Sequence, residues 1–152
     1  MPWVTRCSLK NIEIGNHIKP INCILIRILD PDNKYPPKVF YEELFNSIHI
    51  FSFLDLDKDD PDPRMESINN AQAKEIAKII KNANENNYNI IVHCTMGLSR
   101  SGSVCEAIEA AFNYEYLHDG FLCPNLLVKS KILRFINTLL KEEELQDDEI
   151  FN

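Results

Sequence analysis

The sequence lacks several features that would assign it to a specialised class of protein. No apolar run among its 152 residues approaches membrane-spanning length, and the stretch MPWVTRCSLK has no apolar core of signal-peptide length. Basic residues are not in excess, since the formal net charge is −7, which argues against a broad nucleic-acid-binding surface. We therefore expect a cytoplasmic protein with neither a nucleic-acid nor a membrane partner.

The cysteines lack the patterns of a structural framework. They are odd in number and form neither a C-x-x-C pair nor a His/Cys cluster at zinc spacing. The five are Cys7, Cys23, Cys94, Cys105 and Cys123. A disulfide framework and a structural metal are therefore disfavoured, and a reducing compartment is the better expectation.

The chain does have the composition of one globular domain. Hydrophobic residues make up 45% and charged residues 26%, and the length is enough to bury a core. Neither a repeat nor a linker divides the chain. We expect a monomer with a single domain over residues 1–141, followed by an acidic, flexible tail over residues 142–152.

Apolar patterns predict strands that alternate with helices. Strands are predicted at 3–7, 22–29, 47–53 and 89–92. Helices are predicted from Ser67 as the N-cap, after Arg100, and over 126–141, with two helical turns within 39–45 and a loop over 113–125. This alternation is typical of an α/β domain with a central, mainly parallel sheet flanked by helices.

Two polar loops follow predicted strands directly. LDLDKDDPDP follows the strand at 47–53, and HCTMGLSRSG begins where the strand at 89–92 ends. Ligands of parallel sheets bind beyond the carboxyl ends of the strands. We therefore expect both loops at the same edge of the sheet, where they can act together.

The loop after Cys94 has the features of an anion site. Residues 95–99 can wrap with their backbone N–H groups inward, with Gly97 easing the tight backbone, and such a nest at a helix N-terminus binds anions. The same field stabilises a thiolate. The guanidinium of Arg100 can hold two oxygens of one phosphoryl group.

A thiolate that faces a clamped phosphorus atom can displace the leaving group and form a phosphocysteine. Ser101 can donate a hydrogen bond to the sulfur when it leaves. His93 either orients the loop or is a satisfied histidine at a strand end. A lone cysteine is more often a buried structural thiol, but the combination with Arg100 and Gly97 favours a nucleophile.

HCTMGLSRSG matches the H-C-x5-R-[S/T] signature of cysteine-dependent protein tyrosine phosphatases, and it resembles most their compact dual-specificity branch. As a pattern, the resemblance spans residues 20–140. It implies a protein tyrosine phosphatase-like fold and an enzyme without metal or cofactor. Its nucleophile would be Cys94, and Arg100 would clamp the phosphate. Its phosphate cradle would be formed by Thr95, Met96, Gly97, Leu98, Ser99 and Arg100.

The chain departs from this family in two respects. Met96 stands where many members carry Ala, so the pocket wall is expected to be bulkier. The W-P-D motif that carries the general acid of larger tyrosine-specific enzymes is absent. Another acid is therefore needed to protonate the leaving oxygen.

The acid candidates are Asp55, Asp57, Asp59, Asp60 and Asp62. Strand register favours Asp55, which follows the strand directly, as the acid does in compact family members. Asp55 lies 39 positions before Cys94, more than the usual thirty-odd, and by spacing Asp60 (34) or Asp62 (32) fits better. Because strand ends are fixed while loop lengths vary, the order is Asp55, then Asp57, with Asp60 and Asp62 behind.

The leading hypothesis is a phosphoprotein phosphatase acting on phosphotyrosine, with phosphoserine and phosphothreonine as further candidates. Phosphoinositide phosphatases of this superfamily carry lysines in the loop, whereas TMGLS has none. RNA 5′-phosphatases need a basic surface, and this chain is acidic. A silent phosphopeptide-binding module is the third alternative, although such relatives usually lose the cysteine or the arginine.

Overall fold

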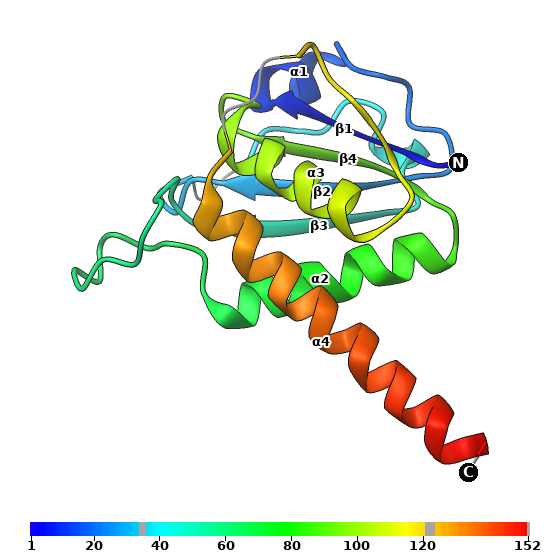
Figure 1. Ribbon diagram of the computed structural model, residues 1–152. Coiled ribbons are helices and arrows are strands. Elements are labelled where there is room, and N and C mark those ends of the chain that lie inside the picture. Colours follow the sequence, from blue (N-terminus) through cyan, green and yellow to red (C-terminus); the bar gives the residue numbers. More distant parts are fainter. Residues whose placement is uncertain (34–35, 121–123, 152) are drawn as a thin grey trace.

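The computed structural model describes residues 1–33, 36–120 and 124–151 (Figure 1). Its strands form a five-stranded sheet in the order β3-β2-β4-β1-β5, and every neighbouring pair is parallel. The strands are β1 (Trp3–Ser8), β2 (Cys23–Leu29), β3 (Ser47–Ser52), β4 (Asn89–Cys94) and β5 (Glu115–Leu117). The helices are α1 (Leu9–Ile14), α2 (Asn70–Glu85), α3 (Ser99–Ala111) and α4 (Leu126–Phe151), with a 3-10 turn η1 (Glu42–Leu44). The expected α/β fold is thus confirmed.

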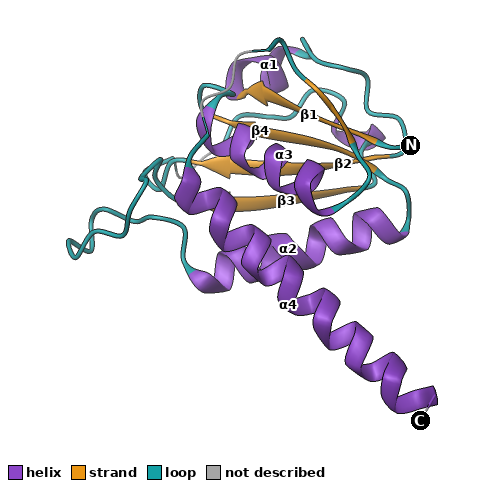
Figure 2. Cartoon of the chain, in the orientation of Figure 1, coloured by secondary structure: helices purple, strands orange, loops and turns teal. Residues whose placement is uncertain are grey.

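The central strands are covered on both faces, which explains their continuous apolar runs. Ile24, Ile26 and Ile28 of β2 join the larger core beneath α2, α3 and α4 (Figure 2). Leu25, between them, joins a smaller core with Ile12 of α1. Alternate side chains of one strand therefore fill two cores, and the sheet between them is held rigidly.

Some boundaries differ from the sequence predictions. The N-cap of α2 is Asn69, not Ser67, and forms a capping box with Gln72. Ser67 instead donates to Asp59 within the acidic loop, at 2.6 Å. The two helical turns expected within 39–45 reduce to η1, because Tyr41 adopts a left-handed conformation with φ of 63°.

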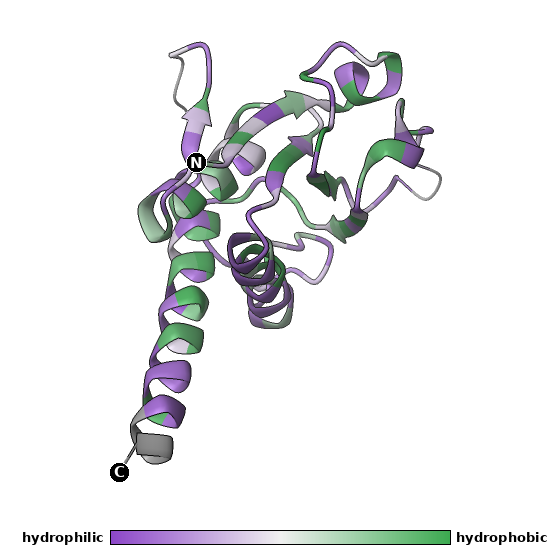
Figure 3. Ribbon diagram, turned by 90° about the vertical axis from the view of Figure 1, so that its right-hand side faces the viewer, coloured by the Kyte–Doolittle hydropathy of each residue, from purple (hydrophilic) through white to green (hydrophobic). Residues whose placement is uncertain are grey.

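The segment after α3 was also predicted incompletely. Residues 113–125, expected to be a loop, contain the edge strand β5, whose three residues include a single buried side chain, that of Tyr116. The predicted end of the last helix at residue 141 is wrong, because α4 continues to Phe151 and makes the acidic segment helical. An ion pair of 3.2 Å between Lys81 of α2 and Glu143 anchors this extension, whose turns are largely hydrophilic (Figure 3).

The parallel arrangement positions the candidate site. Strands β3, β2 and β4 are neighbours, so the segments after Ser52, Leu29 and Cys94 emerge side by side at one edge of the sheet. Both polar loops singled out in the sequence leave from this edge. In the described part of the chain, no helix combines the length and the apolar character needed to cross a membrane.

Candidate active site

Cys94 is the last residue of β4 and is buried, with 2% of its surface exposed. Its sulfur lies 3.1 Å from the hydroxyl of Ser101, which is itself fully buried in the first turn of α3. The strand therefore delivers the thiol to the sheet edge, and the following helix places a hydroxyl against it. This is the pair that the sequence motif predicted.

The loop from Thr95 to Leu98 is pinned to β1 and α1 from outside. The Thr95 carbonyl accepts from the backbone N–H of Leu9 at 3.2 Å, and the Leu98 carbonyl accepts from Arg6 at 3.3 Å. In a trans peptide the N–H points opposite to the C=O. The N–H groups that follow these carbonyls, those of Met96 and Ser99, are therefore directed toward the inside of the loop, as an anion nest requires.

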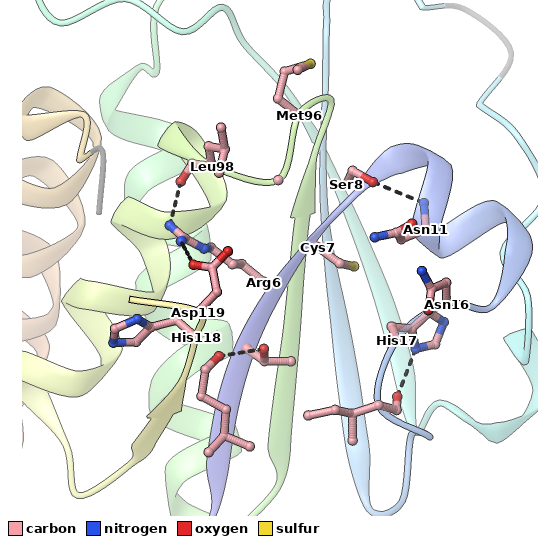
Figure 4. Close-up of a pocket in the computed structure, with 14 residues that line it drawn as sticks. Arg6, Cys7, Ser8, Asn11, Asn16, His17, Met96, Leu98, His118 and Asp119 are labelled. Carbon is pink, nitrogen blue, oxygen red and sulfur yellow. Dashed lines mark hydrogen bonds and ion pairs between the residues drawn. The ribbon is translucent and has the colours of Figure 1, made fainter. Parts of the chain in front are cut away.

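Gly97 seats the loop on β1. Its φ is +72°, and an added Cβ would lie 2.5 Å from the carbonyl carbon of Cys7 and from the nitrogen of Ser8. A side chain at this position would force the loop off the strand. Met96 lies at the crest of the loop with 72% of its surface exposed and borders a cavity of about 370 Å³ outside it (Figure 4). The bulk expected in the pocket wall therefore lies largely in solvent.

Arg100 is buried in the first turn of α3, and its guanidinium is held along one edge. Nη1 donates to Asp30 Oδ1 and to the carbonyl oxygen of Phe53, each at 2.8 Å. Nη2 lies 3.3 Å from Thr95 Oγ1, which in turn donates to Asp30 Oδ2 at 3.0 Å. Because Nη1 holds two protein oxygens, Nε and Nη2 form the edge with which Arg100 would meet a phosphoryl group.

Sequence reasoning missed Asp30. It follows β2 directly, just as Asp55 follows the segment after β3, and so it lies at the same sheet edge. Its two carboxylate oxygens contact Arg100 and Thr95 separately. The position at a strand end was the signal that could have identified it.

Among the acidic candidates, the structure brings Asp55 to the cysteine loop. Asp55 Oδ1 accepts a hydrogen bond from Ser99 Oγ at 3.0 Å and another from Asn125 Nδ2 at 2.7 Å. Asp57 lines an apolar cavity beside α4 with Leu126. Asp55, which strand register favours, therefore lies at the cysteine loop, whereas Asp57 lies beside α4, and the identity of the acid stays a prediction.

The remaining candidates are engaged within the acidic loop itself or with α4. Hydrogen bonds from Ser67 and Lys131 lower the pKa of Asp59. Asp60 accepts from the backbone N–H of Asp62, and Asp62 forms an ion pair with Arg64. These contacts shape the loop.

Asn125 is the second residue that sequence reasoning missed. It is 4% exposed and caps α4, with its Oδ1 accepting from the N–H of Val128 at 3.1 Å. Its Nδ2 donates to Asp55 and to the Leu56 carbonyl at 2.9 Å, and its backbone N–H donates to Ser103 Oγ of α3. One residue, through its side chain and its backbone N–H, thus ties the candidate acid to two helices. An Asn before a helical pattern is a capping signal, and that signal was readable.

The other described cysteines differ from Cys94 in their surroundings. Burial raises the pKa of Cys7 and of Cys23 to about 12. Burial also raises the pKa of Cys105, which is enclosed in α3. Each of these thiols stays protonated and unreactive at neutral pH, as expected for packing residues. All four described cysteines are free, and Cys123 lies outside the described residues.

Comparison of the chain with models of known protein families gives no match, and comparison with curated proteins gives none either. The geometry stands by itself as evidence. It assembles a thiol, a fixed guanidinium, inward-directed amides and a carboxylate at one sheet edge. These are the groups that a nucleophilic displacement on a tetrahedral anion requires.

Proposed function

We propose that this protein is a phosphatase that hydrolyses phosphorylated proteins, phosphotyrosine foremost, through a phosphocysteine intermediate. The observation that carries the proposal is that Asp55, from the segment after β3, contacts the loop that carries Cys94 and Arg100 six positions apart. Packing alone would account for a buried thiol. A buried thiol at a sheet edge that also holds a fixed guanidinium and a carboxylate is typical of a catalytic site.

In the first step, the Cys94 thiolate attacks phosphorus, and the S–P bond forms as the bond from phosphorus to the leaving oxygen breaks. Asp55, in its acid form, gives its proton to that oxygen, so the product leaves as an alcohol or phenol. Arg100 and the amides of residues 95–100 hold the three remaining phosphoryl oxygens. Their positions are fixed before reaction, so charge is stabilised without reorganisation.

In the second step, water attacks the phosphocysteine while the Asp55 carboxylate takes a proton from it. The S–P bond breaks, and the electron pair returns to sulfur. Ser101, 3.1 Å from Cys94 Sγ, donates a hydrogen bond to the departing thiolate. Inorganic phosphate leaves, and Asp55 is again protonated for the next cycle.

A protein substrate is favoured over a polyanionic one by the charge around the site. The acidic loop that begins at Asp55 contains five aspartates, and Asp55 at its base contacts the cysteine loop. Like charges disfavour an RNA end or an inositol ring that carries several phosphates. A single phosphate on a peptide is repelled least. A reducing compartment such as the cytoplasm suits this chemistry, because the nucleophile must remain a thiolate.

The test is hydrolysis of an aryl phosphate and of a phosphotyrosine peptide, with and without vanadate. We expect vanadate-sensitive turnover in the wild type and none in Cys94→Ser, with acid-stable phosphate on Cys94 after rapid quenching. Cys105→Ser is the matched control and should retain turnover. Absence of vanadate-sensitive hydrolysis would refute the enzyme, and phosphopeptide binding without turnover would favour the binding module.

A further inference from the structure

A buried arginine lies behind the cysteine loop and takes no direct part in the proposed reaction. Arg27 interrupts the otherwise apolar strand CILIRIL and is 4% exposed. Its Nε donates to Nε2 of His93 at 2.9 Å, and its Nη2 donates to the Pro37 carbonyl at 3.0 Å. Burial lowers the pKa of Arg27 even though Glu42 opposes the shift. Burial of a charged guanidinium costs free energy, so a buried arginine in an apolar strand indicates a specific role for its side chain.

The contact with Arg27 determines the state of the histidine. Arginine has five N–H donors and no acceptor, so Nε2 of His93 must accept and carries no hydrogen. The ring is therefore the Nδ1–H tautomer. Burial, together with the charge of Arg27, lowers the pKa of His93 to about 3, so the ring is neutral at any pH near neutrality.

The other nitrogen of this ring faces the backbone of Cys94. His93 directly precedes Cys94, is fully buried, and interacts through its ring with the Cys94 backbone. Nδ1 is buried and does not complete a well-aligned hydrogen bond within the described part of the chain. An N–H can only donate, so the backbone group that it approaches is a carbonyl. Contacts thus connect Arg27 on β2, through His93 on β4, to Cys94 at the start of the loop.

We propose that Arg27 is a positioning residue that acts through His93: it fixes a neutral Nδ1–H ring against the turn by which Cys94 enters the loop. This role rests on the proposed function, in which Cys94 is the nucleophile. The test therefore measures the reactivity of the Cys94 thiol itself as well as turnover. Without Arg27, Nε2 would lose its donor and become free to take a hydrogen. The orientation of the ring under Cys94 would then vary with pH.

Among the described residues, the titratable and charged groups placed against His93 besides Arg27 are Cys7 of β1, its register partner, and Arg100 of α3, whose charge also lowers the pKa of the ring. Cys7 stays protonated below about pH 12. Arg100 stays charged throughout the useful range. A new pH dependence after substitution of Arg27 would therefore belong to His93.

The experiment compares Arg27→Met and Arg27→Lys with Leu25→Ala, a control on the same strand and the same face that is equally buried. Three quantities are measured: the tautomer of His93 by nitrogen NMR, the rate of Cys94 alkylation by iodoacetamide between pH 5 and 9, and kcat against KM for an aryl phosphate. Leu25→Ala monitors the effect of lost packing.

In the wild type we expect the Nδ1–H tautomer. Arg27→Met should give mixed tautomers of His93 and an additional ionisation in the alkylation profile. It should also lower kcat about tenfold at similar KM, the scale of one lost hydrogen bond to a charged group. Arg27→Lys keeps a donor and the charge and should recover part of kcat. Leu25→Ala should lower the midpoint of thermal unfolding but leave the tautomer of His93, the alkylation profile of Cys94, and kcat and KM unchanged.

Two results would overturn the role of Arg27. One is an Nε2–H tautomer in the wild type, which can be read even if Arg27→Met fails to fold. The other is an alkylation profile in Arg27→Met that matches the wild type. If alkylation responds to Arg27 but the wild type hydrolyses no phosphate ester, the positioning role stands and the proposed function fails.

Discussion

Replacement of Asp55 by Asn tests the assignment of the general acid most directly. The amide keeps the shape of the side chain and an oxygen that can accept the hydrogen bond from Ser99 Oγ, which lies 3.0 Å from Asp55 Oδ1 in the wild type. An amide is not an acid, however, so it cannot protonate the leaving oxygen. General acid catalysis contributes about 10²- to 10⁴-fold, which at 1.36 kcal/mol per tenfold is about 3 to 5 kcal/mol of activation free energy. Loss of a hydrogen bond from Asn125 costs only about 1 kcal/mol of stability.

The assay is a series of aryl phosphates whose phenols differ in acidity. An acidic phenol leaves without a proton, so Asp55→Asn should then be only mildly impaired. A phenol as weakly acidic as the tyrosine side chain, with a pKa of about 10, leaves efficiently only when the general acid protonates its oxygen. The ratio of wild-type to variant kcat should therefore rise steeply along the series. The descending, alkaline limb of the wild-type rate profile should disappear in the variant.

The matched control is Asp57→Asn, two positions further along the same loop. Asp57 lines the cavity beside α4. We expect its kcat to stay close to the wild-type value for every phenol. The reasoning is refuted if Asp55→Asn keeps its alkaline limb and its turnover of a phosphotyrosine peptide, or if the large loss follows Asp57 instead.

Three further outcomes follow from the contacts of the site. Asp30→Ala should lower kcat/KM about tenfold, chiefly through KM, because the Nη1 edge of Arg100 loses a charged partner. Competitive inhibition by inorganic phosphate measures the affinity of the site for the anion in the variant and in the wild type. Asn125→Ala should lower both kcat and, by about 1 kcal/mol, stability, because α4 loses its cap and Asp55 loses its amide donor; the aryl phosphate assay and thermal unfolding measure the two effects. Ser101→Ala should slow the second step on the order of tenfold, since the leaving thiolate loses its donor, and phosphocysteine should accumulate in rapid-quench experiments.

The sequence predicted the parts of the fold in which local pattern and burial agree. The runs that became β2 and β4 are apolar throughout because both their faces are covered, and they were placed within a residue or two. Strand β5 was missed because three residues with one buried side chain carry no periodic signal. The end of α4 was missed because the acidic turns after residue 141 carry little apolar periodicity; within them, Glu143 forms an ion pair with Lys81 of α2.

The same contrast holds within the site. Cys94, Arg100 and Ser101 lie within eight consecutive residues, so a strand, a nest and a helix start were enough to bring them together. The supporting residues pair across long stretches of chain: Asp30 and Arg100 are 70 positions apart, and Arg27 and His93 are 66 apart. Such pairs depend on strand order, which apolar periodicity does not specify.

Strand order and register also explain why sequence spacing and strand register favour different candidates for the acid. The backbone N–H of Leu54 donates to the carbonyl of Glu66 at 2.6 Å, so the acidic loop is closed at its base beside β3. The residues between extend away from the domain (Figure 1) and add length without moving the base. Asp55, next to that closure, keeps a position set by the sheet, whatever the length of the excursion. The separation of 39 positions between Asp55 and Cys94 in the sequence therefore depends on the length of the loop. The distance of 3.0 Å between Asp55 and Ser99 depends instead on the positions of the strand ends in the sheet.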